Sequence, residues 1–148
     1  MKIILAVLLT VFAATPALAE DWYRVAASER GLHYVDADSI TRTGGVATGL
    51  ENAIWREPTE SGMVRATTRI EVNCADLSYR YRSHTFFDAD GTSDTADGDG
   101  NLRRPRPGSS IEAVAGFICG RFGEAERLRG VTPEEDARRN SAAAAPVA

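Results

Sequence analysis

Lysine, cysteine and histidine are all scarce in this sequence of 148 residues. Of the 17 basic residues, the only lysine is Lys2 and all the others are arginine. The two cysteines and two histidines show no recognisable nucleophile motif and no metal-ligand spacing. The sequence therefore predicts no catalytic residue, metal site or cofactor, and an enzyme such as a hydrolase is the least favoured class. Nothing in it indicates nucleic-acid binding.

Long hydrophobic runs are also scarce. The apolar run from Ile3 to Ala14 is too short to cross about 30 Å of hydrocarbon as a helix. It follows a basic start and precedes a proline and a small-residue triplet, which is typical of a secretory signal peptide over residues 1–19. We expect cleavage before Glu20, export to the periplasm or the outer surface, and no transmembrane segment in the mature chain. No cysteine follows the cleavage site, so lipid attachment there is not expected.

The expected export determines how the two cysteines are interpreted. An oxidising compartment favours a disulfide between Cys74 and Cys119. The loop that it closes spans about 45 residues, for which chain entropy predicts a stabilisation of about 4 kcal/mol. The alternatives are two free buried thiols, or a catalytic cysteine assisted by His33 or His84.

Residues 22–87 have the pattern of successive short strands separated by turn residues. The expected strands are 22–27, 32–35, 46–55, 63–74 and 77–87. The clearest is 63–74, in which small or apolar residues occupy even positions and mostly charged or polar residues occupy odd positions. The 77–87 strand alternates with the opposite parity. This alternation predicts that one face of each strand is buried.

The two alternating strands also predict their own pairing. An even-length connection around Ala75 and Asp76 keeps their apolar faces on the same side. The expected pairs are Cys74 with Leu77, Val72 with Tyr79, Glu71 with Arg80 and Arg69 with Arg82. This register predicts a basic stripe on the outer face, a candidate partner-binding surface, made of Arg65, Arg69, Arg80, Arg82 and His84. An ordinary solvated face is the alternative.

The segment from Asp88 to Gly100 is rich in aspartate and glycine and is expected to be an acidic loop. An EF-hand needs glycine at its sixth position and glutamate at its twelfth, whereas counting from Asp88 gives Ser93 and Asp99. A weak calcium site of another kind remains an alternative. The basic residues that follow, at 103–106, are expected to neutralise part of this charge.

A helix is expected after this loop, because Ser109 and Glu112 have capping-box spacing. The apolar positions 111, 114, 117 and 118 form one stripe that can lie on the sheet. Beyond it, we expect a helical extension over 124–129 and disorder in the final 15 or so residues. The sequence thus predicts an α+β domain over 20–120 and a polar, partly disordered tail over 121–148. The domain would have a single antiparallel sheet of about five to six strands, a C-terminal helix packed on one face, and one disulfide.

Several short motifs follow one another in a characteristic order. They are Trp22, the segment Tyr34–Ile40, Trp55, Cys74, the segment Tyr79–Arg82, the turn Phe87–Gly91, the segment Pro107–Ser110, and Cys119. In this order they resemble the surface-adhesin protein E-like family of exported bacterial proteins. The residues taken as the family's structural motif are Trp22, Tyr34, Asp36, Asp38, Ser39, Pro107, Gly108 and Ser109. We interpret the segment from Tyr34 to Ile40 as a corner in which Asp and Ser oxygens satisfy backbone amides.

The resemblance implies an antiparallel sheet with a helix on one side and a non-enzymatic role at the bacterial surface. It implies binding to host matrix or plasma proteins such as laminin, vitronectin or plasminogen, and a homodimer is one expected assembly. The alternative is a periplasmic structural or stress-response domain without a host ligand. A small-molecule or haem-binding protein is less favoured.

Overall fold

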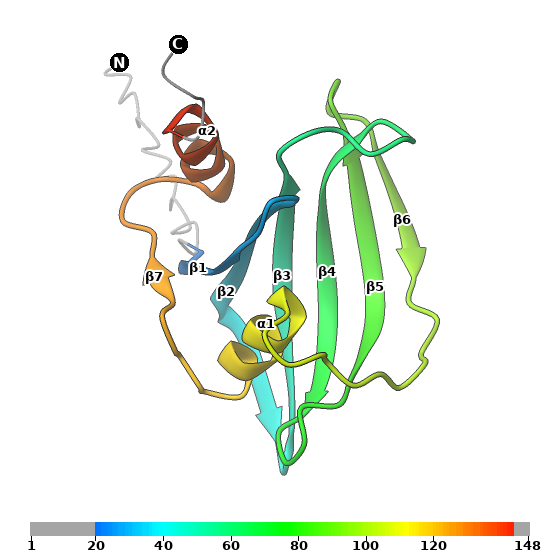
Figure 1. Cartoon of the computed structure of the whole chain (residues 1–148). Helices are drawn as coiled ribbons and strands as arrows, with labels where there is room; N and C mark the ends of the chain where they lie inside the picture. Colours follow the sequence, from blue (N-terminus) through cyan, green and yellow to red (C-terminus); the bar gives the residue numbers. More distant parts are fainter. Residues whose placement is uncertain (1–19, 144–148) are drawn as a thin grey trace, which may run out of the picture.

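The computed structural model describes residues 20–143, which form one antiparallel sheet and two helices (Figure 1). The strands are β1 (Trp22–Ala27), β2 (Gly31–Thr43), β3 (Val46–Trp55), β4 (Met63–Asn73), β5 (Tyr79–Asp88), β6 (Ser93–Asp97) and β7 (Glu126–Arg127). The helices are α1 (Ser110–Ile118) and α2 (Pro133–Ala143). The strand order is β6-β5-β4-β3-β2-β1-β7, so six strands follow the chain and β7 returns to the far edge. The predicted signal peptide and residues 144–148 of the expected tail lie outside the described residues.

The sheet has seven strands rather than the expected five to six, because a short strand is added at each edge. β6 forms within the acidic segment and pairs with β5, and all five of its residues are exposed. β7 pairs with β1 through Tyr23 with Arg127 and Arg24 with Glu126. An edge strand needs only backbone pairing to one neighbour, so no apolar alternation marks either strand in the sequence.

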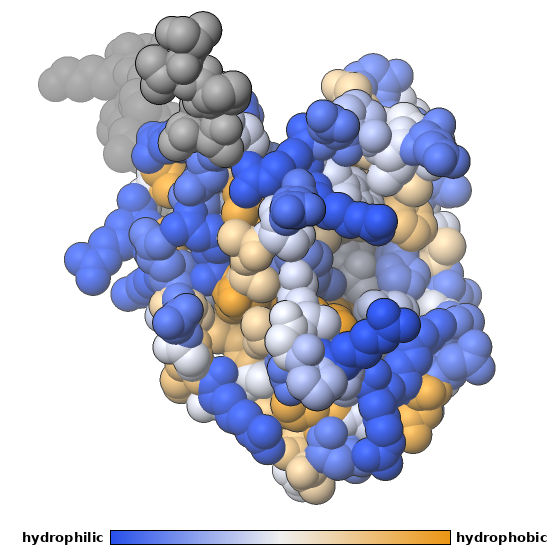
Figure 2. Space-filling view, in the orientation of Figure 1, coloured by the Kyte–Doolittle hydropathy of each residue, from blue (hydrophilic) through white to orange (hydrophobic). Residues whose placement is uncertain are grey.

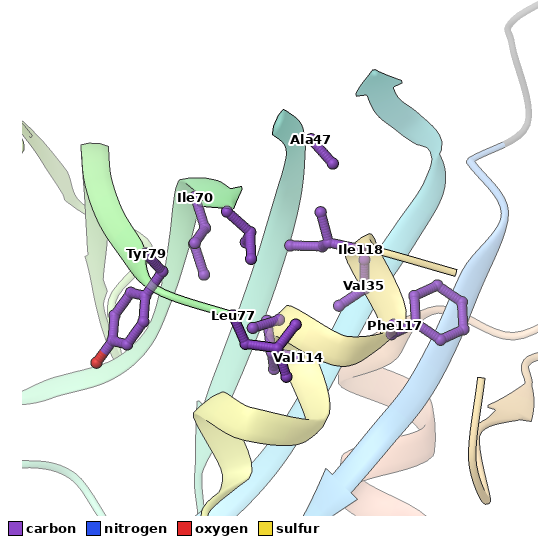
Figure 3. Packing of buried hydrophobic residues seen from close by; sticks show 10 residues of the cluster. Val35, Ala47, Ile70, Leu77, Tyr79, Val114, Phe117 and Ile118 are labelled. Carbon is purple, nitrogen blue, oxygen red and sulfur yellow. The ribbon is translucent and has the colours of Figure 1, made fainter. Parts of the chain in front are cut away.

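α1 lies across one face of the sheet and closes the main core (Figure 1). The predicted cap is confirmed: the Ser109 hydroxyl accepts from the Glu112 N–H, and the Glu112 carboxylate accepts from the Gly108 N–H at 2.7 Å. Figure 3 shows the buried side chains that meet between helix and sheet. A Cβ on Gly49 would lie 2.9 Å from the Ile118 Cγ1 atom, so the glycine allows the helix to approach β3 closely.

The predicted disulfide is confirmed. Cys74 follows β4 and Cys119 is the C-cap of α1, and their Cα atoms lie 5.4 Å apart. The bond therefore holds the C-terminal end of α1 against the end of β4.

The predicted pairing of β4 with β5 is correct only near the turn. Val72 lies opposite Tyr79 and Glu71 opposite Arg80, as expected. A bulge then inserts one extra residue in β5, so that Arg69 lies opposite Ser83 and not opposite Arg82. Since a one-residue shift exchanges the two faces of a strand, every β5 side chain beyond the bulge points to the side opposite to the predicted one.

The prediction for the C-terminal segment is wrong at two places. Residues 124–129 contain strand β7 and not a helical extension, and residues 133–143 form helix α2 and are not disordered. The Thr132 hydroxyl accepts from the Glu135 N–H at 3.2 Å, and the Glu135 carboxylate accepts from the Thr132 N–H at 3.0 Å. This capping box, with Pro133 at the first helical position, starts the helix despite its few apolar residues.

α2 packs on the face opposite to α1. Ala137 of α2 is buried and belongs to a second core cluster, which also contains Trp22, Leu32 and Tyr34. The sheet is thus covered on both sides, by α1 over its main core and by α2 over the smaller one.

Candidate partner-binding surface

The predicted basic stripe lies on the face that α2 covers in part. Arg65 and Arg69 share a face of β4, and Arg80 of β5 lies opposite Glu71 on that face. Arg80 Nε is 3.2 Å from one Glu71 carboxylate oxygen, and Arg82 Nε is 3.6 Å from the other. Four of the five predicted residues therefore lie on one side of the sheet, and two of them, Arg80 and Arg82, share the Glu71 carboxylate.

These arginines differ in their contacts and in how exposed their side chains are. The Arg65 guanidinium lies 3.4 Å from the centre of the Phe87 ring, and its Nε is 3.6 Å from Glu134 of α2. Arg69 is exposed and has no ion pair within the part of the chain that the structure describes. The Arg82 side chain is 52% exposed. Arg69 and Arg82 are consequently the arginines of this face most available to a partner.

His84 does not belong to this face, which corrects the prediction. The bulge turns it toward the α1 side, where its Nδ1 lies 3.1 Å from the Thr68 hydroxyl. Its ring is 4.9 Å from that of Tyr81 and 5.5 Å from that of Phe86, centre to centre. Burial disfavours the imidazolium and lowers the pKa of His84 below its ordinary value.

The α1 side also holds a buried carboxylate that the sequence did not reveal. Glu51 is only 6% exposed and lies opposite Thr68, which in turn lies opposite His84. Its Oε1 atom is 2.8 Å from Nδ1 of His33. The available signal was that Glu51 shares the parity of the buried residues of β3, Ala47 and Gly49. Figure 2, which views this side, shows mostly hydrophilic side chains with apolar ones gathered around α1.

Asp36 and Ser39 form the predicted structural corner. The Asp36 Oδ1 atom accepts from the N–H groups of Asp38 at 3.1 Å and Asp21 at 3.2 Å. The Ser39 hydroxyl donates to the Asp36 carbonyl at 2.6 Å and accepts from the Leu50 N–H at 2.8 Å. It thereby bridges the interval in which β2 and β3 lose their register, and burial raises the pKa of Asp36.

Two other motif residues connect the sheet to the chain ends. Tyr34 is fully buried and its hydroxyl donates to Asp136 of α2 at 2.9 Å. The Trp22 indole N–H donates to Glu20 at 2.7 Å. The segment Pro107–Ser109 leads into the cap of α1, with Gly108 in the left-handed region at φ +76°.

The acidic segment makes local contacts. Asp90 accepts from the Thr92 N–H at 2.9 Å, and Asp99 forms an ion pair with Arg103. These hydrogen bonds lower the pKa of both aspartates. Over residues 20–143, no three His, Cys, Asp or Glu side chains come together in an arrangement that would hold a metal ion. Within the same residues, no helix is long and apolar enough to cross a membrane.

The comparisons with known proteins agree with the resemblance seen in the sequence. The sequence model of a family described as surface-adhesin protein E matches residues 22–120. A structure of Haemophilus influenzae protein E in crystal form II is 14% identical to the chain, with a TM-score of 0.51, and covers 79% of this chain and 100% of that one. A second structure of the same protein is 15% identical, with a TM-score of 0.49 and coverages of 76% and 94%. The first likeness supports the fold. A search of curated proteins finds no match.

Proposed function

This chain belongs to the surface-adhesin protein E family, and from that premise we propose that it is an exported, non-enzymatic module that binds extracellular host proteins through its arginine-bearing face. Laminin, vitronectin and plasminogen are the partners to test first. The observation that carries the proposal is the group of four arginines on one sheet face, of which Arg69 and Arg82 are the most exposed. Arginine presents a planar set of donors that suits the carboxylates of a protein partner.

The charge balance supports this choice of face. The chain has a formal net charge of −4, so its arginines do not follow from an overall basic composition. On the arginine-bearing face, Glu71 is shared between Arg80 and Arg82 and can neutralise only one of them. An acidic partner surface would meet uncompensated positive charge here, which favours its association.

Capture of immobilised laminin, vitronectin and plasminogen tests the proposal. The protein used is the chain from Glu20 to Ala148, compared with its Arg69→Glu/Arg82→Glu variant. We expect this variant to lose about tenfold or more in affinity, equivalent to about 1.4 kcal/mol or more. The control is Arg106→Glu/Arg129→Glu, which makes the same charge change at two exposed arginines away from this face. Equal losses in both variants would mean that only net charge matters, and capture that is unchanged would contradict the proposed face.

The location of the protein distinguishes the second candidate, a periplasmic structural or stress-response domain. Protease treatment of intact cells should remove the protein if it is displayed at the outer surface. Protection until the outer membrane is opened would favour the periplasmic role and would remove the basis for host binding.

A further inference from the structure

A groove of about 500 Å³ lies between α2 and the ends of β3, β4 and β5. Its apolar lining comes from both sides. The sheet contributes Ile54, Val64 and Phe87, and α2 contributes Ala137. Val64 lies at the irregularity between Met63 and Arg65 where β4 loses its register with β5. The groove exists because of α2, which the sequence did not predict.

The rim of the groove is unevenly charged. Arg56 and Arg138 are both exposed and have no ion pair within residues 20–143. The Arg56 guanidinium donates to the backbone carbonyl of Ser28, at 3.2 Å. Two carboxylates also line the groove. Glu134 already contacts Arg65, which leaves Asp88 as the remaining carboxylate beside two guanidinium groups that have no ion pair within residues 20–143. An anion beside an apolar group is therefore the chemistry that complements this rim.

The groove continues into the arginine-bearing face along β4. Arg65 lines the groove, and Arg69 lies four residues further on the same face of the same strand. At about 3.3 Å per residue, an extended ligand lying along β4 would cover this separation with about four residues of its own. A ligand with one charged end could neutralise the rim or Arg69, but not both.

We infer that this groove binds an extended peptide segment of a partner protein, in which an apolar side chain enters the groove between acidic residues. One acidic residue beside the anchor meets Arg56 and Arg138, and another, about four residues away, meets Arg69. The inference deepens the proposed function and rests on it, because it names the partner chemistry that the arginine-bearing face would recognise. An amphipathic lipid with a single headgroup is the competing occupant.

Fluorescence anisotropy with defined probes tests the inference on the chain from Glu20 to Ala148. The first probe is a labelled peptide with a Phe-Leu anchor, flanking Asp and Glu residues, and a further Asp-Glu pair four residues away. The second has Lys in place of every acidic residue, and the third keeps the acids but has Ser in place of Phe and Leu. Sodium dodecanoate serves as the lipid-like competitor. We expect binding of the first probe only, and no displacement by dodecanoate below its micellar concentration.

Two pairs of variants locate the binding. Arg56→Glu/Arg138→Glu should weaken the first probe at least tenfold, whereas Arg106→Glu/Arg129→Glu should leave it unchanged. Ser141→Trp places a large ring at an exposed position that lines the groove, and it should abolish binding. Ser61→Trp makes the same change in an exposed loop outside the groove and should have no effect. Circular dichroism confirms that each variant keeps α2.

Three results would overturn the inference: equal binding of the acidic and lysine probes, binding of dodecanoate instead of the peptide, or unchanged binding by Ser141→Trp. The experiments distinguish an error in the groove inference from an error in the proposed function. If Arg69→Glu/Arg82→Glu loses host-protein capture while the groove variants keep it, the arginine-bearing face binds the host protein and the groove does not take part. If no host protein is captured at all, the proposed function itself fails.

Discussion

At the scale of single residues, Asp136 connects three elements that are far apart in the sequence. Its Oδ2 atom accepts from the Tyr34 hydroxyl at 2.9 Å and lies 2.8 Å from Arg24 Nη1, and Arg24 also contacts Glu126. Burial and the neighbouring carboxylate raise the pKa of Tyr34, so the phenol stays protonated and acts as a donor. A helix with few apolar residues is thus held on the sheet mainly by polar contacts.

Replacing Asp136 should therefore release α2. Asp136→Ala removes the acceptor of a fully buried hydroxyl and of a mostly buried guanidinium, which we expect to cost about 2–3 kcal/mol. Tyr34→Phe removes a single hydrogen bond and should cost about 1 kcal/mol. Urea unfolding measures both free energies. Asp94→Ala, at an exposed strand position, is the matched control and should be neutral; a similarly small effect at Asp136 would show that α2 does not depend on this contact.

His84 should make the stability of the protein depend on pH below neutrality. Its folded-state pKa lies below the ordinary value of about 6.5, so the unfolded chain binds more protons between the two values. Stability is fully present above about pH 6.5 and falls as the pH decreases toward the folded-state pKa. Glu51 and Asp99 oppose this lowering, whereas Arg103 adds to it.

His84→Phe keeps an aromatic ring between Tyr81 and Phe86 but cannot titrate. We expect the free energy of unfolding of this variant to change less between pH 7 and pH 5 than that of the unmodified chain. Urea unfolding at several pH values measures how steeply the free energy of unfolding depends on pH in each protein. Parallel slopes would mean that other groups account for the acid sensitivity.

At the scale of elements, alternation in the sequence predicted the regular parts of the sheet. β4 follows the predicted parity from Arg65 to Asn73, and the turn-proximal pairs of β4 and β5 are correct. The bulge at Arg82 could not be foreseen, because the apolar and polar residues around it fit either register locally. That single extra residue places His84 on the other face of the sheet. It also places the Phe87 ring beneath the Arg65 guanidinium.

α2 was missed for a different reason. Its sequence from Pro133 to Ala143 has too few apolar residues to form an amphipathic stripe, and the local signals were its capping box and the proline at its first position. Its position depends on contacts with Arg24, Tyr34 and Asn52, more than 80 residues away in the chain. The arginine-bearing face was therefore predictable in outline from the sequence, whereas the groove beside it was not.

The disulfide joins the ends of β4 and α1, which are also linked by a hydrogen bond from the Arg121 side chain to the Cys74 carbonyl at 3.2 Å. The Cys74→Ala/Cys119→Ala variant should lose about 4 kcal/mol, the value for a closed loop of about 45 residues. Urea unfolding of this variant and of the unmodified protein gives the difference. Intact-mass analysis provides the control for oxidation, since reduction should add two hydrogens. A loss below about 1 kcal/mol would show that the packing of α1 alone fixes this end of the core.

At the scale of the whole molecule, the most exposed arginines of the sheet face and the aspartates of its edge lie on different strands. The arginine-bearing face spans β4 and β5, while β6 presents Asp94 and Asp97 at the edge. The outer backbone groups of an edge strand are free to pair with another chain unless charge or shape prevents it. β7, at the other edge, is only two residues long. The longer of the two edge strands is thus β6, and it carries two negative charges.

We therefore predict that the charges of β6 limit self-association. In Asp94→Thr/Asp97→Thr, repulsion between two β6 edges disappears and β propensity rises. The weight-average mass at about 0.1 mM should then increase, with a dissociation constant at least tenfold lower (about 1.4 kcal/mol) than that of the unmodified chain. Analytical ultracentrifugation measures this change, and Glu57→Thr/Glu60→Thr in the β3–β4 loop makes the same charge change away from the edge. If both double variants associate equally, net charge governs association; if neither associates more than the unmodified chain, the β6 edge is protected by its geometry and not by its aspartates.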